Sequence, residues 1–215
     1  MRKFCLTIIV LAGFSKALFA QFGNCTASEM QTYTDRETGN TITILTDTLK
    51  NDRFLYQTDP MWTHDGKYLL FRSSSRANDK KIERTLPNGE KRSWTPTQIY
   101  FIEMATGQII QATEGPDLGS AFLANKSNRM FISRKEKEDW NMYVMDLDKF
   151  FADVKKGKVG KPTAYETLLG TFPTSMGRPG GYAIDCNDDY AYITVEREGT
   201  EEEKERMAKN AFLPE

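Results

Sequence analysis

The chain has 215 residues, and its 29 Lys and Arg against 30 Asp and Glu leave a formal net charge of -1. So small a charge excludes the long-range field that gathers nucleic acid or an anionic membrane, and we expect no nucleic-acid partner. Aromatic residues at 12%, with 15 Gly for turns, favour an all-β fold. The one histidine, His64, excludes a metal site built from several imidazoles of this chain alone.

Residues 1–20 have the pattern of a secretory signal peptide. Arg2 and Lys3 precede an apolar run that ends at Gly13, and small residues lead to Ala20. The apolar run is about ten residues long, whereas a transmembrane helix needs about 20. We therefore expect cleavage after Ala20, export to the periplasm or the exterior of a bacterial cell, and no membrane span.

Two cysteines, Cys25 and Cys186, remain once the signal peptide has removed Cys5. In an oxidising compartment they could form one disulfide, or they could stay as two separate thiols, because two cysteines carry no spacing code. Lipidation of Cys25 is a lesser alternative, since no Leu-rich box precedes it.

A degenerate repeat of short strands begins in the first third of the mature chain. Trp62 to Phe71 places an Asp-Gly hairpin turn before an apolar strand, Gln98 to Met104 gives the next strand, and Ile109 to Thr113 gives the last. A polar insertion, Asn78 to Thr95, interrupts the unit. This pattern predicts a first full blade of a β-propeller at about residues 55–113.

The same unit recurs twice. A second blade is predicted at about 120–170, with a basic insertion from Lys149 to Lys161, and a third blade starts at about 180–196. A capping box at residues 200–203 then predicts a helix at about 201–212.

The N-terminal strands have no complete blade of their own. Residues 32–46 imitate the outer strand pair of the first blade but lack an inner pair before them. A closed propeller needs four or more blades, because closure is what removes exposed sheet edges. We therefore expect residues 21–215 to form a partial β-propeller, an incomplete arc at the start of a longer protein.

Trp62 to Phe71, with its aromatic residue, small residues, Asp-Gly-Lys and apolar strand, resembles the WD-like repeat of Tol-system β-propellers. The order of segments along the chain is more similar to that of oligogalacturonate lyases. The segments that carry this resemblance are Asp35–Gly39, Arg53–Gln57, Asp65–Phe71, Gln111–Gly115 and Gly181–Glu196.

The resemblance to oligogalacturonate lyases implies a β-elimination that degrades pectin fragments: a base removes the proton next to a uronate carboxylate while a cation stabilises the developing charge. In that family the base is a histidine, and histidines and a glutamine from later blades hold manganese. The resemblance thus implies manganese for a full-length protein, but no catalytic residue, metal ligand or cofactor here. His64 is expected to be an exposed turn residue.

The implied partners are an acidic oligosaccharide and the remaining C-terminal propeller blades. The alternative function is that of a non-enzymatic Tol-system-like propeller, which binds a protein or another envelope partner through the same axial face. Histidines clustered on further strands would favour the lyase, and continued Asp-Gly-Lys repeats without them would favour the binding protein.

Residues that contact substrate should be arginines and aromatic residues near the propeller axis, because each sugar of oligogalacturonate carries a carboxylate. The candidates are Arg53, Tyr56, Gln57, Arg72, Arg76, Arg134 and Arg178. For each arginine the alternative is an ordinary solvated surface position.

Two further polar runs are interpreted without a ligand. The run from Asp185 to Asp189 lacks the ligand spacing of a calcium loop and predicts a hairpin turn. The run from Lys135 to Glu138 alternates in charge and predicts a solvated loop.

Overall fold

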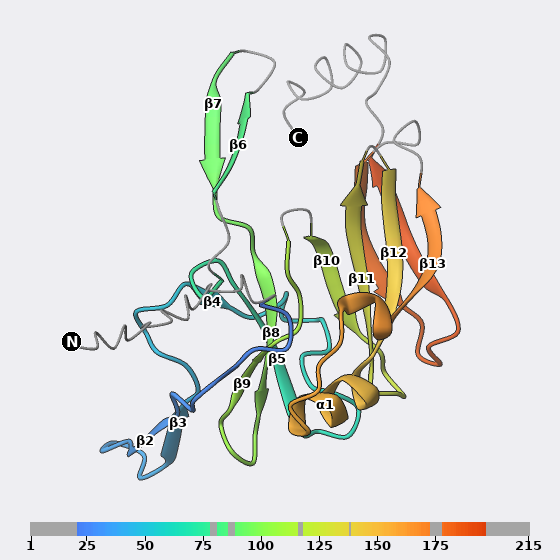
Figure 1. Cartoon of the computed structure of the whole chain (residues 1–215). Helices are drawn as coiled ribbons and strands as arrows, with labels where there is room; N and C mark the ends of the chain where they lie inside the picture. Colours follow the sequence, from blue (N-terminus) through green and yellow to red (C-terminus); the bar gives the residue numbers. More distant parts are fainter. Residues whose placement is uncertain are drawn as a thin grey trace, which may run out of the picture.

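The computed structural model describes residues 21–77, 81–85, 89–115, 118–137, 139–172 and 178–196 (Figure 1). In this part of the chain, strands dominate and a single α-helix is present. Two antiparallel sheets form the body, and three two-stranded sheets accompany them. The all-β prediction is confirmed as an incomplete, propeller-like arrangement. The predicted signal peptide and the helix predicted at about 201–212 lie outside the described residues.

The first sheet has the strand order β1-β9-β8-β5-β4. Its strands are β1 (Cys25–Thr26), β4 (Asp52–Arg53), β5 (Tyr68–Ser73), β8 (Gln98–Glu103) and β9 (Ile109–Gln111). The Asp-Gly turn before β5 is closed by the Thr63 hydroxyl, which donates to Asp65 at 2.8 Å, while Gly66 takes a φ of +69° that suits glycine. Trp62 then bridges to Leu69, so this turn fixes the register of the apolar strand.

The polar insertion between β5 and β8 contains a hairpin of its own. Strand β6 (Ile82–Thr85) pairs with β7 (Lys91–Trp94), and Ile82 lies opposite Trp94. The hairpin projects from the body of the molecule (Figure 1). It belongs to neither of the two large sheets.

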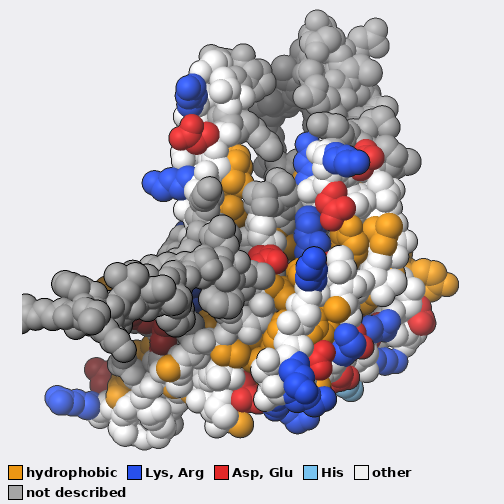
Figure 2. Space-filling model, in the orientation of Figure 1, with side chains coloured by type: hydrophobic (Ala, Val, Ile, Leu, Met, Phe, Trp, Pro, Cys, Tyr) orange, Lys and Arg blue, Asp and Glu red, His pale blue; other side chains and the backbone are white. Residues whose placement is uncertain are grey.

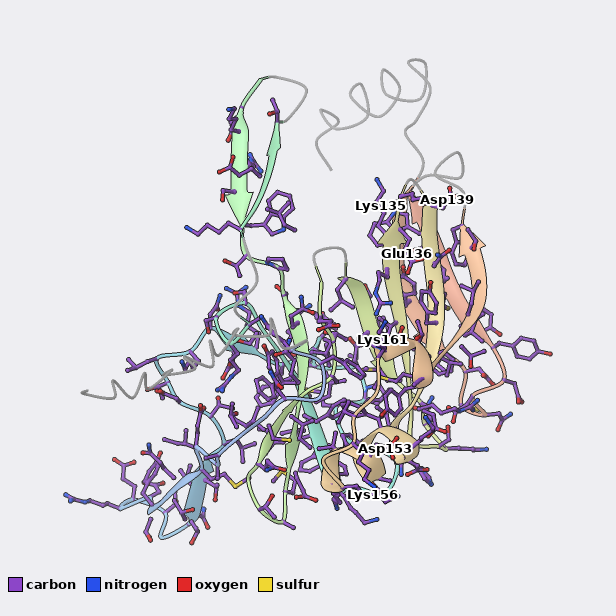
Figure 3. All side chains as sticks on the ribbon, in the orientation of Figure 1. Lys135, Glu136, Asp139, Asp153, Lys156 and Lys161 are labelled. Atoms are coloured by element: carbon purple, nitrogen blue, oxygen red, sulfur yellow. The ribbon has the colours of Figure 1, made fainter. Side chains whose placement is uncertain are left out.

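The second sheet has the order β10-β11-β12-β13. Its strands are β10 (Leu118–Leu123), β11 (Arg129–Glu136), β12 (Asp139–Asp146) and β13 (Glu166–Phe172). The prediction of a solvated loop at this charge run is wrong for Lys135 and Glu136, which extend β11 and pair with Trp140 and Asp139 of β12. Lys137 follows in the turn, with a φ of +57°. Lys135, Glu136 and Asp139 are at the end of the sheet away from the helix (Figure 3).

Helix α1 (Leu147–Lys155) occupies part of the segment interpreted as a basic insertion. Asp146 caps its first turn, because the carboxylate accepts from the Lys149 N–H at 2.9 Å. One face of α1 is buried, at the i, i+3, i+4, i+7 spacing of an amphipathic helix. The buried residues are Leu147, Phe150, Phe151 and Val154. The prediction of a basic insertion does not include this helix. Only Lys149 and Lys155 of the basic residues lie in α1, and the other lysines of the segment follow it. A short 3-10 helix (Pro162–Ala164) follows.

The main core lies between the two sheets and α1. Leu70 and Phe101 of the first sheet are fully buried in the same cluster as Ile132 of the second sheet. Helix α1 closes this core, because the Phe151 ring stacks on Tyr68 with centroids 3.6 Å apart. Each sheet thus buries a face against the other, as successive propeller blades do.

The opposite face of the first sheet carries a smaller core of Phe71, Tyr100, Ile102 and Ile109. Met30 and Leu45 pack against it, on either side of the hairpin formed by β2 (Gln31–Thr34) and β3 (Thr41–Ile44). The hairpin itself is largely exposed.

A last hairpin, β14 (Arg178–Ile184) with β15 (Ala191–Glu196), packs on the second sheet, where Phe122 and Tyr182 have ring centroids 5.6 Å apart. Its turn contains Asp188, which has a φ of +65° and a side chain that is 1% exposed. The Asp188 carboxylate accepts from the N–H groups of Asn125 at 2.6 Å and Lys126 at 2.8 Å. These oxygens dock the turn onto the second sheet.

Removing the charge of Asp188 should weaken this docking. We expect Asp188→Asn to lower the free energy of unfolding by about 1–3 kcal/mol, because an amide group replaces one of the two carboxylate oxygens that accept from the N–H groups of Asn125 and Lys126. Asp189→Asn, in the same turn, is the matched control and should cost less than about 0.5 kcal/mol. Urea unfolding at pH 7 measures both, and equal losses would contradict the role given to Asp188.

The same contact gives stability a dependence on pH. Burial raises the pKa of Asp188. The opposite effect is larger and comes from the amides of Asn125 and Lys126, the Ser127 hydroxyl and the Arg129 charge, so the pKa lies below its ordinary value. The ionised carboxylate therefore stabilises the fold fully above the ordinary Asp pKa of about 4, and this contribution is lost as pH falls through the lowered value. Asp188→Asn should flatten the acid limb of the stability profile.

Candidate functional site

A pocket of about 530 Å³ lies where the first two sheets and the base of the β6–β7 hairpin meet. This volume is within the range of about 300–1,000 Å³ typical of small-molecule sites. Its lining residues are Asn51, Arg53, Leu55, Tyr56, Asp59, Arg72, Ser74, Trp94, Pro96, Thr97, Ile99, Leu118, Gly119, Ser120, Ala121 and Phe122.

Two positive charges face each other at one wall of this pocket. Arg53 of β4 is the direct cross-strand partner of Arg72 of β5, and both are exposed. Arg53 Nε donates to Asn51 Oδ1 at 3.3 Å, but neither guanidinium forms an ion pair with a carboxylate within the described residues. Like charges directly opposite each other on a sheet are destabilising, so the pair is best satisfied by a bound anion.

The segment between β4 and the β5 turn forms the next wall. Leu55 packs against the main core and anchors this segment, while Tyr56 beside it stays 67% exposed. The Asp59 N–H donates to the Tyr56 carbonyl at 2.8 Å and closes a turn. Tyr56 thus lines the same pocket as the arginine pair.

Strand β10 of the second sheet supplies the facing wall, where three small residues lie between Leu118 and Phe122. A Cβ at Gly119 would collide with the Ser133 hydroxyl and the Trp140 ring, so only glycine lets this strand lie so close to its neighbours. The Ser133 Oγ accepts from the Ser120 N–H at 2.8 Å and holds the strand at a bulge in its register. The small side chains leave room for a ligand.

The structure brings together three of the sequence candidates, Arg53, Tyr56 and Arg72, in this one pocket. Gln57 is exposed on the neighbouring segment but does not line the pocket. Arg178 begins β14, and its side chain lies outside the described part of the structure.

Arg76 is committed to an internal ion-pair network. Its side chain is 6% exposed and contacts Glu29 at 2.5 Å and Asp52 at 2.6 Å. Burial lowers the pKa of Arg76, but the hydrogen bonds and charges of both carboxylates raise it above its ordinary value. Arg76 therefore ties the segment before β2 to the edge of the first sheet.

Arg134 is likewise held inside the protein. It donates two hydrogen bonds to Glu166, at 3.0 and 2.9 Å, and the Glu166 side chain is only 2% exposed. Its guanidinium also lies over the Tyr143 ring, 5.3 Å from the centroid. Arg134 joins β11 to β13 and does not line the pocket.

Trp94 lines the pocket but was not a sequence candidate. It ends β7, in the insertion that the sequence pattern marks only as polar. The Asn-Gly pair at residues 88–89, between two segments of strand-forming residues, is the hairpin signal that could have revealed it.

The described residues do not fit a manganese site. No group of three or more His, Cys, Asp or Glu side chains is placed to hold a metal in the part of the chain that the structure describes. His64 is exposed, and its Nδ1 lies 2.9 Å from the Asn125 carbonyl oxygen. Cys25 and Cys186 are both exposed free thiols. Among the described helices, none is long and apolar enough to cross a membrane.

The two large sheets pack face to face with a pocket between them, and this arrangement is propeller-like. Comparison with solved structures shows which propellers it resembles. A structure of oligogalacturonate lyase in complex with manganese matches with a TM-score of 0.53 at 19% identity, over 78% of this chain and 36% of that chain. The oligogalacturonate lyase of Vibrio parahaemolyticus matches with a TM-score of 0.53 at 20% identity, over 77% and 35%.

The chain therefore shares the fold of oligogalacturonate lyases, as the order of its segments predicts, and spans about a third of their length. Neither a family model nor a curated protein matches the sequence.

The two kinds of arginine should behave differently on substitution. Arg76→Met should lower the free energy of unfolding by about 3 kcal/mol, because it leaves the carboxylate of Asp52, 9% exposed, without its partner. Arg72→Met, the matched control in β5 just before Arg76, should change it by less than about 0.5 kcal/mol. Chemical unfolding of both variants is the measurement, and a large loss for Arg72→Met would mean that this arginine supports the fold.

Proposed function

We propose that this chain forms part of the substrate-binding face of an oligogalacturonate-lyase-like enzyme, which breaks acidic pectin fragments by β-elimination. The observation that carries the proposal is the Arg53–Arg72 pair in the pocket between the first two sheets. The shared fold supports the reaction class, because lyases of this fold act on a substrate with a carboxylate on every sugar.

The pocket suits such a ligand chemically. A guanidinium offers a planar fork of donors to a carboxylate, and two of them side by side hold either two carboxylates or one from both sides. The ring of Tyr56 offers an apolar face with a polar tip for a sugar. A bound uronate would also relieve the repulsion between the two arginines.

This part of the chain binds and orients the substrate in our proposal. It does not remove the proton, because the described residues offer no histidine on the pocket wall and no metal cluster. In this proposal the base and the manganese come from further blades of a longer protein, because the chain matches only about a third of the length of the lyases. We further propose export to the periplasm, on the signal-peptide pattern of residues 1–20.

Calorimetric titration with trigalacturonate tests the binding role. We expect the chain to bind it and Arg72→Met to weaken binding about tenfold, the effect of losing one charge-assisted contact. Arg36→Met is the control, since Arg36 is exposed on the β2–β3 hairpin away from the pocket. The fully methyl-esterified trisaccharide, which has no carboxylates, should not bind.

A chain that binds neither form, or binds both equally well, would contradict the proposal and leave the non-enzymatic propeller as the remaining function. Formation of an unsaturated uronate is followed by ultraviolet absorbance. The chain alone should form none, even with manganese, so activity of the chain alone would contradict the division between binding and catalysis.

A further inference from the structure

The β6–β7 hairpin has the geometry of an arm rather than of a core element. It is a two-stranded ribbon inserted between β5 and β8, and Lys91, Arg92, Ser93 and Trp94 are all exposed. It pairs only with itself and projects from the two sheets (Figure 1). An isolated two-stranded ribbon of this length contributes little to stability in water. We therefore ask which ligand its exposed side chains could bind.

The ribbon is continuous with the pocket. Trp94 ends β7, and both Trp94 and the next residues toward β8, Pro96 and Thr97, line the pocket that contains Arg53 and Arg72. Trp94 is 39% exposed. A ligand that leaves the pocket past Trp94 therefore reaches the ribbon.

The charge of the ribbon is opposite to that of the chain as a whole. Residues 81–94 contain four basic side chains and two acidic ones, so their net charge is +2, whereas that of the chain is -1. Figure 2 shows Lys and Arg side chains along the outer edge of the projecting ribbon, with an acidic side chain between them. Arg92 is partly offset by Glu90, whose Oε1 is 3.2 Å from its Nε, and both are exposed to solvent.

From these observations we propose that the β6–β7 ribbon is a binding arm for acidic oligosaccharides too long for the pocket, and that it sets a preference for longer chains. The inference rests on the proposed function of the pocket. Carboxylates repeat along an oligogalacturonate, so sugars beyond the pocket present charges to the ribbon, with Trp94 stacking at the junction. Exposed charge contacts are individually weak, so the arm acts through several of them.

The test compares two ligands of different length, digalacturonate and octagalacturonate, with one double variant. Lys91→Gln/Arg92→Gln should weaken binding of the octamer about fivefold and leave binding of the dimer within about twofold. The salt dependence of octamer binding should also become shallower, because fewer exposed charges take part.

The control removes the same charge elsewhere. Lys156 and Lys161 are exposed near helix α1, at a distance from the ribbon (Figure 3). Lys156→Gln/Lys161→Gln should leave binding of both ligands unchanged. All four positions are exposed, so thermal unfolding should show no loss of stability in either double variant.

The outcomes separate the two proposals. Equal weakening of dimer and octamer by Lys91→Gln/Arg92→Gln, or no weakening of either, would overturn the binding arm and leave the pocket's function intact. Failure of the unmodified chain to bind either ligand would contradict the proposed function itself.

Discussion

The fold depends on the burial of one face of each main sheet against the other. Fully buried residues from β5, β8, β11 and β12 meet in one cluster, which α1 closes from the side through the Phe151–Tyr68 stack. This apolar contact is the largest source of stability that the described residues show, because burial of aliphatic and aromatic surface dominates folding energetics. It also determines how closely the strands that line the pocket approach one another.

The pocket follows from that packing. Strand alternation directs Asp52 and Arg53 to opposite sides of β4, so Asp52 pairs with Arg76 while Arg53 lines the pocket. Arg76 and Arg134 thus form ion pairs with buried carboxylates of the protein itself. The cross-strand pair at the pocket, Arg53 and Arg72, forms no such ion pair within the described residues and can bind a ligand. The pairing of β4 with β5 places the two arginines opposite each other before any substrate binds.

The sequence predicted the elements whose signals are local. The Asp-Gly turn and the apolar run from Tyr68 to Phe71 indicated β5 directly, and the aromatic and glycine content indicated an all-β fold. Helix α1 was not predicted, because the interpretation of residues 149–161 followed their lysine content and not the buried spacing of Phe150 and Phe151. Which arginines face the pocket depends on partners distant in the chain, such as Glu166 for Arg134, and no local pattern contains that information.

The central claim is that Arg53 and Arg72 hold the carboxylates of an acidic oligosaccharide. A crystal structure of the chain with trigalacturonate tests it most directly. Our account predicts a uronate carboxylate within hydrogen-bond distance of both guanidinium groups, with a sugar ring against Tyr56. An oligosaccharide bound at another surface, with both arginines contacting only solvent or a carboxylate of the protein itself, would contradict it.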